Sequence, residues 1–200
     1  MRFVLATLNP DKLREVAALF PKDLGELVAL SAFPGAVAPH ETGATLAENA
    51  LLKARAALAL TGLPSIADDT GLEVEALGGE PGVRSARYAG EGAGYDANVR
   101  KLLERMDGID PARRAARFRT VCVACFPARA PIVAEGVLEG HITLEPRGSE
   151  GFGYDPVFEV GRTGRTLAEL PFEEKNRLSH RAAAMAHLVI RIREGLTPPA

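Results

Sequence analysis

The sequence predicts an α/β fold with a mixed β-sheet, and two patterns carry this prediction. Near the N-terminus, a short apolar run leads directly into apolar residues at helical spacing, which is typical of a strand followed by a helix. Later in the chain, two long strand-like segments, 115–127 and 132–144, follow one another after a short connection. A chain that mixes strand-to-helix units with adjacent long strands is expected to form a sheet of this class.

The first predicted unit is a strand over residues 2–7 followed by a helix over residues 10–20. Asn9 is a residue type that caps helices, and Pro10 suits the first helical position. Residues 24–30 form the second predicted strand. The chain therefore begins as a strand, a helix and a strand in direct succession.

A second helix is predicted after a loop rich in proline and glycine at 34–43. Thr45 and Glu48 have the spacing of a capping box, and Gly62 is suited to end the helix. The remaining predicted elements are, in order, a brief strand at 65–67, a weaker strand at 72–77, a mostly loop segment at 78–94, a helix at 95–106, the two long strands, a glycine-aromatic loop at 150–156, and a last helix that Ser179 opens and Gly195 ends.

Composition and charge exclude several classes of protein. The chain has 200 residues, 46% of them hydrophobic and 25% charged, so it can bury about 70% of its unfolded surface as one domain over residues 1–200, or as two lobes sharing a core. A net charge of −2 attracts no polyanion such as nucleic acid. The apolar runs fall far short of the ~20 residues that span a bilayer, and the N-terminus lacks the apolar core of a secretory signal. We therefore expect a cytoplasmic protein with no nucleic-acid or membrane partner.

The two cysteines form a C-x-x-C pattern, which invites a zinc or redox interpretation. Cys122 and Cys125 lie within the predicted strand 118–126. Residues three apart in a strand face opposite sides and lie roughly 10 Å apart. One metal ion or one disulfide cannot use both, so we predict two ordinary buried residues.

The segment between the first strand and the first helix has the features of an anion site. Free N–H groups and the helix dipole favour an anion there, and Thr7, Asn9 and Lys12 add a hydroxyl, an amide and a positive charge. The chain contains 19 arginines and 5 lysines, yet Lys12, Lys53 and Lys175 lie in or beside polar or glycine-bearing segments. A compact ammonium on phosphate is a reason to retain lysine. The alternative is a plain capped turn with a surface lysine.

Three acidic residues are candidates for a metal site. Asp68 and Asp69 follow the brief strand at 65–67, which is therefore predicted to end by presenting two carboxylates. With Glu41, in the loop before the second helix, they could hold Mg²⁺, which takes oxygen ligands from few carboxylates and from substrate phosphates. Neighbouring aspartates in a turn are as often merely solvated. The prediction of phosphate-binding lysines and the prediction of Mg²⁺-binding carboxylates strengthen each other.

Two segments near the C-terminus have the features of a base-binding site. Residues 152–155, Phe-Gly-Tyr-Asp, combine aromatic faces, a flexible backbone and an acceptor, which suits stacking on a planar base. His180 and Arg181 supply donors at the start of the last helix. The alternatives are a core aromatic in a loop and a surface His–Arg pair.

Six segments, taken together, carry a family resemblance. They are Ala6-Thr-Leu-Asn-Pro-Asp-Lys12, Glu41-Thr-Gly-Ala-Thr-Leu-Ala-Glu-Asn-Ala50 with Lys53-Ala54, Ala67-Asp-Asp-Thr-Gly-Leu72, Pro81-Gly82 with Ser85-Ala-Arg-Tyr-Ala-Gly90, Phe152-Gly-Tyr-Asp-Pro156, and Ser179-His-Arg-Ala182. In this order they resemble the Ham1/RdgB-type non-canonical purine nucleoside triphosphate pyrophosphatases, also called dITP/XTP or ITP pyrophosphatases. The resemblance runs nearly from end to end.

The resemblance implies an elongated two-lobed α/β fold around a long mixed sheet with flanking helices, an active site in the cleft between the lobes, and a homodimer. It implies that Asp69 is the proton acceptor and a Mg²⁺ ligand, with Glu41 a second acidic group at the metal and Asp68 its close companion. The implied substrate-binding positions are Thr7, Leu8, Asn9, Pro10, Asp11, Lys12, Lys53, Thr70, Phe152, Gly153, Tyr154, Asp155, Lys175, His180 and Arg181. Leu8 stands where the family commonly has glycine, and Thr70 where serine is common.

The implied activity is Mg²⁺-dependent hydrolysis of ITP, dITP and XTP between the α- and β-phosphates, which releases the monophosphate and pyrophosphate. Donors such as His180 and Arg181 would favour a purine with a carbonyl at position six, because adenine would leave them unpaired. Three alternatives remain: a phosphohydrolase that cuts the terminal bond, a nucleotide sensor without turnover, and an α/β protein with no small-molecule site.

Overall fold

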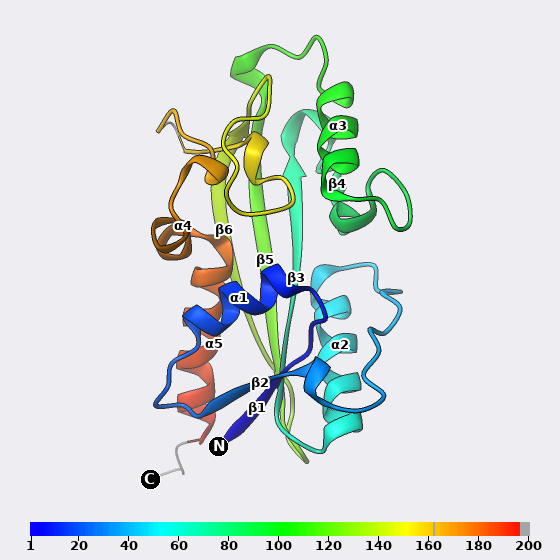
Figure 1. Cartoon of the computed structure of the whole chain (residues 1–200), viewed down its shortest axis with the longest axis vertical. Helices are drawn as coiled ribbons and strands as arrows, with labels where there is room; N and C mark the ends of the chain where they lie inside the picture. The colour runs from blue at the N-terminus through cyan, green and yellow to red at the C-terminus, as the bar shows by residue number, and fades with distance from the viewer. Residues whose placement is uncertain (162, 197–200) are drawn as a thin grey trace. The chain divides into compact units, whose positions relative to one another are not determined.

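The predicted α/β class is confirmed by the computed structural model, which describes residues 1–161 and 163–196. The strands form a mixed sheet in the order β2-β1-β3-β5-β6-β7, with the short β4 paired to β3 (Figure 1). The helices and strands are β1 (Arg2–Leu5), α1 (Pro10–Leu19), β2 (Glu26–Ala29), α2 (Leu46–Thr61), β3 (Ser65–Val74), β4 (Pro81–Gly82), α3 (Tyr95–Arg105), β5 (Ala115–Cys125), β6 (Ile132–Ile142), β7 (Phe158–Val160), α4 (Phe172–Leu178) and α5 (His180–Leu196). Short 3₁₀ turns lie between several of them.

The chain divides into two compact units. Unit 1 comprises Met1–Asp69, Thr120–Gly136 and the chain from Arg181 onward, and unit 2 comprises Thr70–Arg119 and Val137–His180. Strands β3, β5 and β6 contribute residues to both units. The single domain with a cleft between two lobes stays a prediction.

In unit 1, helices cover both faces of the sheet. β1 pairs in parallel with β2 on one side and with β3 on the other. Helices α1 and α5 share a core with these strands that includes Phe3, Val16 and Leu188. Helix α2 contacts β1 and lies on the opposite side of the strands from α1 and α5 (Figure 1). Because successive residues of a strand point to opposite faces, one strand can reach helices on both sides.

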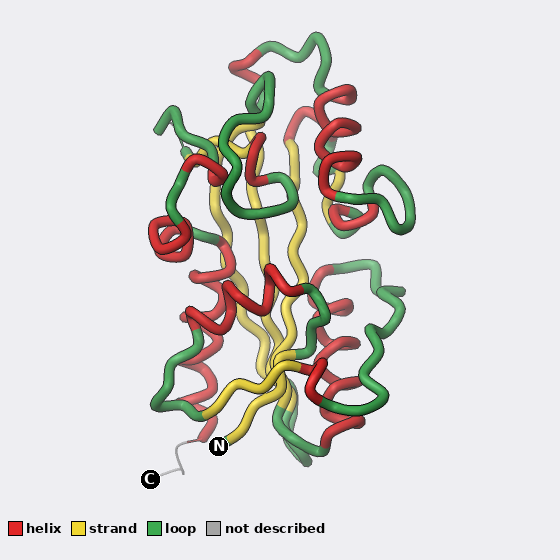
Figure 2. The backbone as a smooth tube through the Cα atoms, viewed as in Figure 1, coloured by secondary structure: helices red, strands yellow, loops and turns green. Residues whose placement is uncertain are grey.

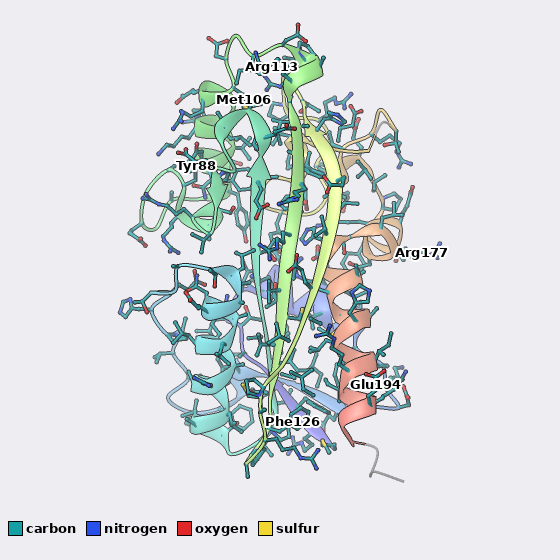
Figure 3. The ribbon with its side chains drawn as sticks, turned by 180° about the vertical axis from the view of Figure 1, so that it is seen from behind. Tyr88, Met106, Arg113, Phe126, Arg177 and Glu194 are labelled. Carbon is teal, nitrogen blue, oxygen red and sulfur yellow. The ribbon has the colours of Figure 1, made fainter. Side chains whose placement is uncertain are left out.

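Unit 2 has its own apolar core and antiparallel pairings. β3 pairs with β4, and β6 pairs with β7. Tyr88 and Met106, both labelled in Figure 3, are buried in this core, whereas Phe126, also labelled there, belongs to the core of unit 1. Each unit therefore has a hydrophobic cluster to hold its polar side chains in place.

The helix boundaries follow the predicted capping residues. The Asn9 side chain accepts hydrogen bonds from the backbone N–H groups of Asp11 and Lys12, at 2.9 and 3.2 Å. Thr45 and Glu48 form the predicted capping box of α2, and Gly62 ends that helix at φ +67°. The segment from residue 34 to 45 is free of helix and strand (Figure 2).

The prediction that a strand ends at Asp68 and Asp69 is wrong. β3 runs without interruption from Ser65 to Val74, so both aspartates lie in its interior. Aspartate is unfavourable in strands by propensity, but here each carboxylate forms an ion pair with at least one lysine or arginine, which outweighs that local preference. The short β4, β7 and α4 also have no counterpart among the predicted elements.

The cysteine prediction is confirmed. Cys122 and Cys125 are free, buried residues of β5. Within residues 1–161 and 163–196, no helix combines the length and the apolar character that crossing a membrane requires.

Candidate active site

The segment from Thr7 to Lys12 connects β1 to α1, as predicted. The backbone N–H of Asn9 donates to the Thr7 hydroxyl at 3.1 Å, and the Asn9 side chain caps the helix. Leu8 is 45% exposed. Among the described residues, Ala128 is the non-glycine residue with a positive φ, so the backbone at Leu8 has a negative φ. This loop therefore forms without the left-handed backbone that would require glycine at position 8.

Asp68 lies on the face of β3 that meets α1 and α5. Its Oδ2 is 3.1 Å from Lys12 Nζ and 3.2 Å from Arg181 Nε. Arg181 is itself buried and forms a second ion pair with Glu15 of α1. Asp68 is thus part of a buried network of two carboxylates and two cations.

Asp69 lies on the other face of β3 and meets α2. Its Oδ1 is 2.8 Å from Lys53 Nζ, which also lies 3.1 Å from Glu41 Oε1. Asn49 Nδ2 donates to Asp69 Oδ2 at 3.4 Å. Lys53 therefore joins the carboxylate on the strand to the carboxylate on the preceding loop. This group is more open to solvent, because the Glu41 side chain is 27% exposed and that of Asp68 only 1%.

The two aspartates differ in pKa. Burial raises the pKa of Asp69, and the attraction of Lys53 and Lys12 offsets this only in part. Burial acts on Asp68 in the same direction, but Lys12, Arg181 and Lys53 outweigh it and hold the pKa of Asp68 well below its usual range. Asp68 is thus a permanent anion near neutral pH, whereas Asp69 takes up a proton more readily.

Unit 2 holds another buried lysine–aspartate pair. Lys175 Nζ is 2.5 Å from Asp155 Oδ2, which also accepts the backbone N–H of Phe152 at 2.8 Å. The same ammonium lies 4.8 Å from the centre of the Phe152 ring, and the Tyr95 ring packs at a centroid distance of 5.7 Å. Gly151 has φ +73°, and a Cβ there would lie 2.1 Å from Asp155 Oδ2. The Lys175–Asp155 pair therefore requires glycine at position 151. The same pair holds the Phe152 ring in place.

The other predicted site residues of unit 2 are Thr70, Gly153, Tyr154 and His180. The His180 ring stacks on Phe118 at a centroid distance of 4.6 Å. Tyr154 is buried and donates its hydroxyl to the Ser85 carbonyl at 2.9 Å, so its polar atom serves the core of unit 2. Thr70 follows Asp69 in β3 and is half-buried.

Comparison with known proteins identifies the family. Residues 3–190 match the Ham1 family. The chain belongs to the Ham1 family. A dITP/XTP pyrophosphatase of Elusimicrobium minutum is 49% identical over 197 residues, covering 96% of this chain and 100% of that protein. Another, from Methylococcus capsulatus, is 53% identical over 194 residues, 96% of each chain.

Solved structures of the Ham1 family have the same fold. A HAM1 protein from Coxiella burnetii aligns with a TM-score of 0.87 at 41% identity, covering 97% of this chain and 99% of that one. A nucleoside-triphosphatase / dITP/XTP pyrophosphatase from Mycobacterium abscessus aligns with a TM-score of 0.73 at 40% identity, covering 99% and 98%.

Within each unit, the structure of this Ham1 chain brings several of the predicted residues together. Those of unit 1 form two groups, one of Lys12, Asp68 and Arg181 and the other of Glu41, Lys53 and Asp69. Those of unit 2 in mutual contact are Phe152, Asp155 and Lys175. The roles of these residues, and those of Thr7, Leu8, Asn9, Pro10, Asp11, Thr70, Gly153, Tyr154 and His180, stay predictions.

Two buried polar residues at the predicted site escaped sequence reasoning. Glu15 pairs with Arg181, and Asn49 contacts Asp69. The signal for Asn49 was present, because it lies four residues before Lys53 and must share its face of α2. Glu15 borders the apolar stripe of α1, where a carboxylate needs a buried cation, but nothing in the local pattern points to Arg181.

Mg²⁺ suits the donors on the Asp69 face of β3. Glu41 and Asp69 direct carboxylate oxygens toward the same cation, the Lys53 ammonium, and Mg²⁺ binds through one or two carboxylates completed by water and phosphate. Asp68 Oδ2 already contacts two cations. The described residues contain no cluster of three or more His, Cys, Asp or Glu side chains that could hold a metal ion.

Proposed function

We propose that this chain catalyses the Mg²⁺-dependent hydrolysis of ITP, dITP and XTP to the nucleoside monophosphate and pyrophosphate. The chain is a nucleoside triphosphate hydrolase of the Ham1 family. The observation that carries the finer proposal is the group around Asp69, in which a buried carboxylate of raised pKa lies beside an ammonium and a second carboxylate. Asp69 can accept a proton from water, Lys53 can bind phosphate, and Glu41 can join Asp69 in binding Mg²⁺.

Asp69 acts as the general base. A raised pKa makes a carboxylate a better proton acceptor, provided that it is still ionised at the working pH. Asp69 takes the proton of a water molecule, the water oxygen forms a bond to phosphorus, and the bond between the α- and β-phosphates breaks. Pyrophosphate leaves with the electron pair of that bond.

The lysines neutralise the phosphates. Lys53 contacts two carboxylates and Lys12 contacts one, so both ammonium groups are held in place before the nucleotide arrives. Such fixed charges stabilise the phosphate oxygens without reorganising during the reaction. Mg²⁺, when bound by Glu41 and Asp69, adds positive charge at the same oxygens.

The side chains of unit 2 recognise the base. The Phe152 ring, held by Asp155 and Lys175, offers an aromatic face for stacking. Lys175 and His180 supply donors for a six-carbonyl, which adenine lacks. A site that leaves polar groups unpaired with the wrong base can discriminate by roughly 10⁴-fold. We also propose that the protein acts as a cytoplasmic homodimer without a nucleic-acid or membrane partner.

The test is the product released from ITP, dITP, XTP, GTP and ATP by the purified chain, with Mg²⁺ and with a chelator. We expect pyrophosphate from the first three, little from GTP or ATP, and none without the metal. Release of inorganic phosphate would establish a phosphohydrolase that cuts the terminal bond. Nucleotide binding without any product would establish a sensor.

A further inference from the structure

Asn49 is fully buried on α2 and hydrogen-bonds to two different parts of the unit 1 site. Its Oδ1 accepts the backbone N–H of Gly43 at 2.8 Å, and its Nδ2 donates to Asp69 Oδ2 at 3.4 Å. Because a backbone N–H can only donate, the amide oxygen must face Gly43 and the amide nitrogen must face Asp69. The orientation of Asn49 therefore follows from its partners.

The hydrogen bond with Gly43 fixes the position of the loop that carries Glu41. A Cβ on residue 43 would lie 2.7 Å from Asn49 Oδ1 and 2.7 Å from Glu48 Cβ, which is too close for any side chain. Glu41 lies two residues earlier in this loop. The Asn49–Gly43 hydrogen bond thus determines how the loop reaches the start of α2.

The contact with Asp69 holds the carboxylate from its second oxygen. Lys53 binds Oδ1 and Asn49 binds Oδ2, and the two side chains lie one turn apart on α2. A carboxylate held at both oxygens cannot rotate about its terminal bond without losing a hydrogen bond. Asn49 is therefore shared by the strand carboxylate and the loop.

We propose that Asn49 is a positioning residue, which sets the orientation of Asp69 and the position of the Glu41 loop for the reaction. This inference rests on the proposed function, in which Asp69 accepts the proton and Glu41 joins it at the metal. Asn49 does not touch the reacting atoms. It acts through Asp69 and Gly43, so its loss is expected to reduce kcat while leaving the KM for the nucleotide close to that of the wild type.

Two variants separate the donor from the acceptor of Asn49. Asn49→Asp keeps the side-chain shape and an oxygen for the Gly43 N–H but replaces the donor to Asp69 with a carboxylate oxygen, whereas Asn49→Ala removes both hydrogen bonds without adding a charge. We expect kcat on ITP to fall about 10- to 100-fold in both, the range found for residues that hydrogen-bond to metal ligands. A wild-type kcat in Asn49→Asp would overturn the inference.

Asn98 on α3 is a matched control. It is also a buried helical asparagine, and its Oδ1 accepts the Ala89 N–H at 2.7 Å, but its Nδ2 donates to the Ala86 carbonyl at 3.2 Å. Asn98→Asp therefore imposes the same chemical change beside a carbonyl oxygen. We expect wild-type kcat for it, with melting temperatures of all variants measured alongside. An equal fall in kcat would show that the Asn49 effect is a general loss of packing.

The side-chain amide of Asn49 gives a readout that does not depend on turnover. Its NH₂ signal in a ¹⁵N–¹H spectrum, assigned by its absence in Asn49→Asp, is expected to shift in Asp69→Asn, while the Asn98 signal stays in place. An unchanged Asn49 signal would overturn the inference even in an active enzyme. If the wild type releases no pyrophosphate but the signal shifts, the proposed function fails, and the shift still supports Asn49 as the residue that positions Asp69.

Discussion

The two faces of β3 at Asp68 and Asp69 place the same side chain in opposite settings. On one face, Asp68 contacts the part-buried Lys12 and the buried Arg181. On the other, Asp69 shares Lys53 with Glu41, at a site more open to solvent. Burial is high for both aspartates, yet one pKa falls and the other rises. More cations act on Asp68, whereas Glu41 adds repulsion at Asp69, so the two pKa values move in opposite directions although both carboxylates are buried.

The largest expected effect is on turnover by Asp69→Asn. The amide cannot accept the proton of water, so we expect kcat on ITP to fall by about 10²- to 10⁴-fold, the usual contribution of general base catalysis. Nucleotide binding, measured by calorimetry, should remain detectable. If Asp69→Asn kept wild-type turnover, another residue would have to be the general base, and the proposed role of Asp69 would be wrong.

The next effect is on stability, through Asp68→Asn. Removing one charge from a buried ion-pair network leaves Lys12 and Arg181 without part of their compensation, which costs about 3–5 kcal/mol of the free energy of unfolding. The control is Asp23→Asn, which breaks an exposed pair with Arg193 at 2.7 Å, where both side chains are at least half exposed. Such a pair contributes about 0–1 kcal/mol. Equal losses in urea unfolding would contradict a special role for the Asp68 network.

The pH dependence of stability should have opposite signs for the two aspartates. The pKa of Asp68 is lowered on folding, so its stabilising contribution is present above the unfolded value of about 4 and is lost as the pH falls through the folded value. The pKa of Asp69 is raised, so its contribution is most favourable at low pH and is lost as the pH rises through the folded value. Without metal, lowering the pH below 4 should therefore narrow the deficit of Asp68→Asn, whereas raising the pH from 4 to 7 should favour Asp69→Asn over the wild type. Parallel melting-temperature profiles for both variants would refute this difference.

The smallest predicted effect concerns α2, the helix that meets Asp69. Thr45→Ala removes one half of the capping box, which costs about 1 kcal/mol. The change is measurable as a lower melting temperature. Thr61→Ala is a control at the other end of the same helix, where the hydroxyl bonds to the Ala57 carbonyl at 2.7 Å. A larger loss from Thr61→Ala would show that the end of α2, rather than its start, limits its stability.

Local sequence patterns predicted much of the fold because the signals are local. Asn9 caps α1, Thr45 and Glu48 cap α2, and Gly62 ends it at a positive φ. In each case the responsible hydrogen bonds join residues a few positions apart. β3 is the exception, since Asp68 and Asp69 in its interior meet cations from Lys12, Lys53 and Arg181, which lie outside the strand's local sequence.

The sequence predicted which residues form the candidate site better than it predicted the contacts among them. Residue types and the family resemblance pointed to Asp69, Glu41 and Lys53, and the structure places them in contact. They could not show which cation meets which aspartate. Glu15 was missed because its partner Arg181 lies 166 positions away, and no local rule relates the two positions.

Because side chains alternate between the two faces of β3, the number of residues that precede Asp68 and Asp69 in this strand matters for the proposed function. Each aspartate reaches its own cations only because an odd or even position in the strand selects one face or the other. Deleting a single residue between Ser65 and Asp68 would turn the Asp69 carboxylate toward α1 and α5 and the Asp68 carboxylate toward α2, although every predicted site residue would still be present. The parity of this short segment is therefore as necessary to the proposed chemistry as the carboxylates that it carries, and substitutions within it should be tolerated far better than insertions or deletions.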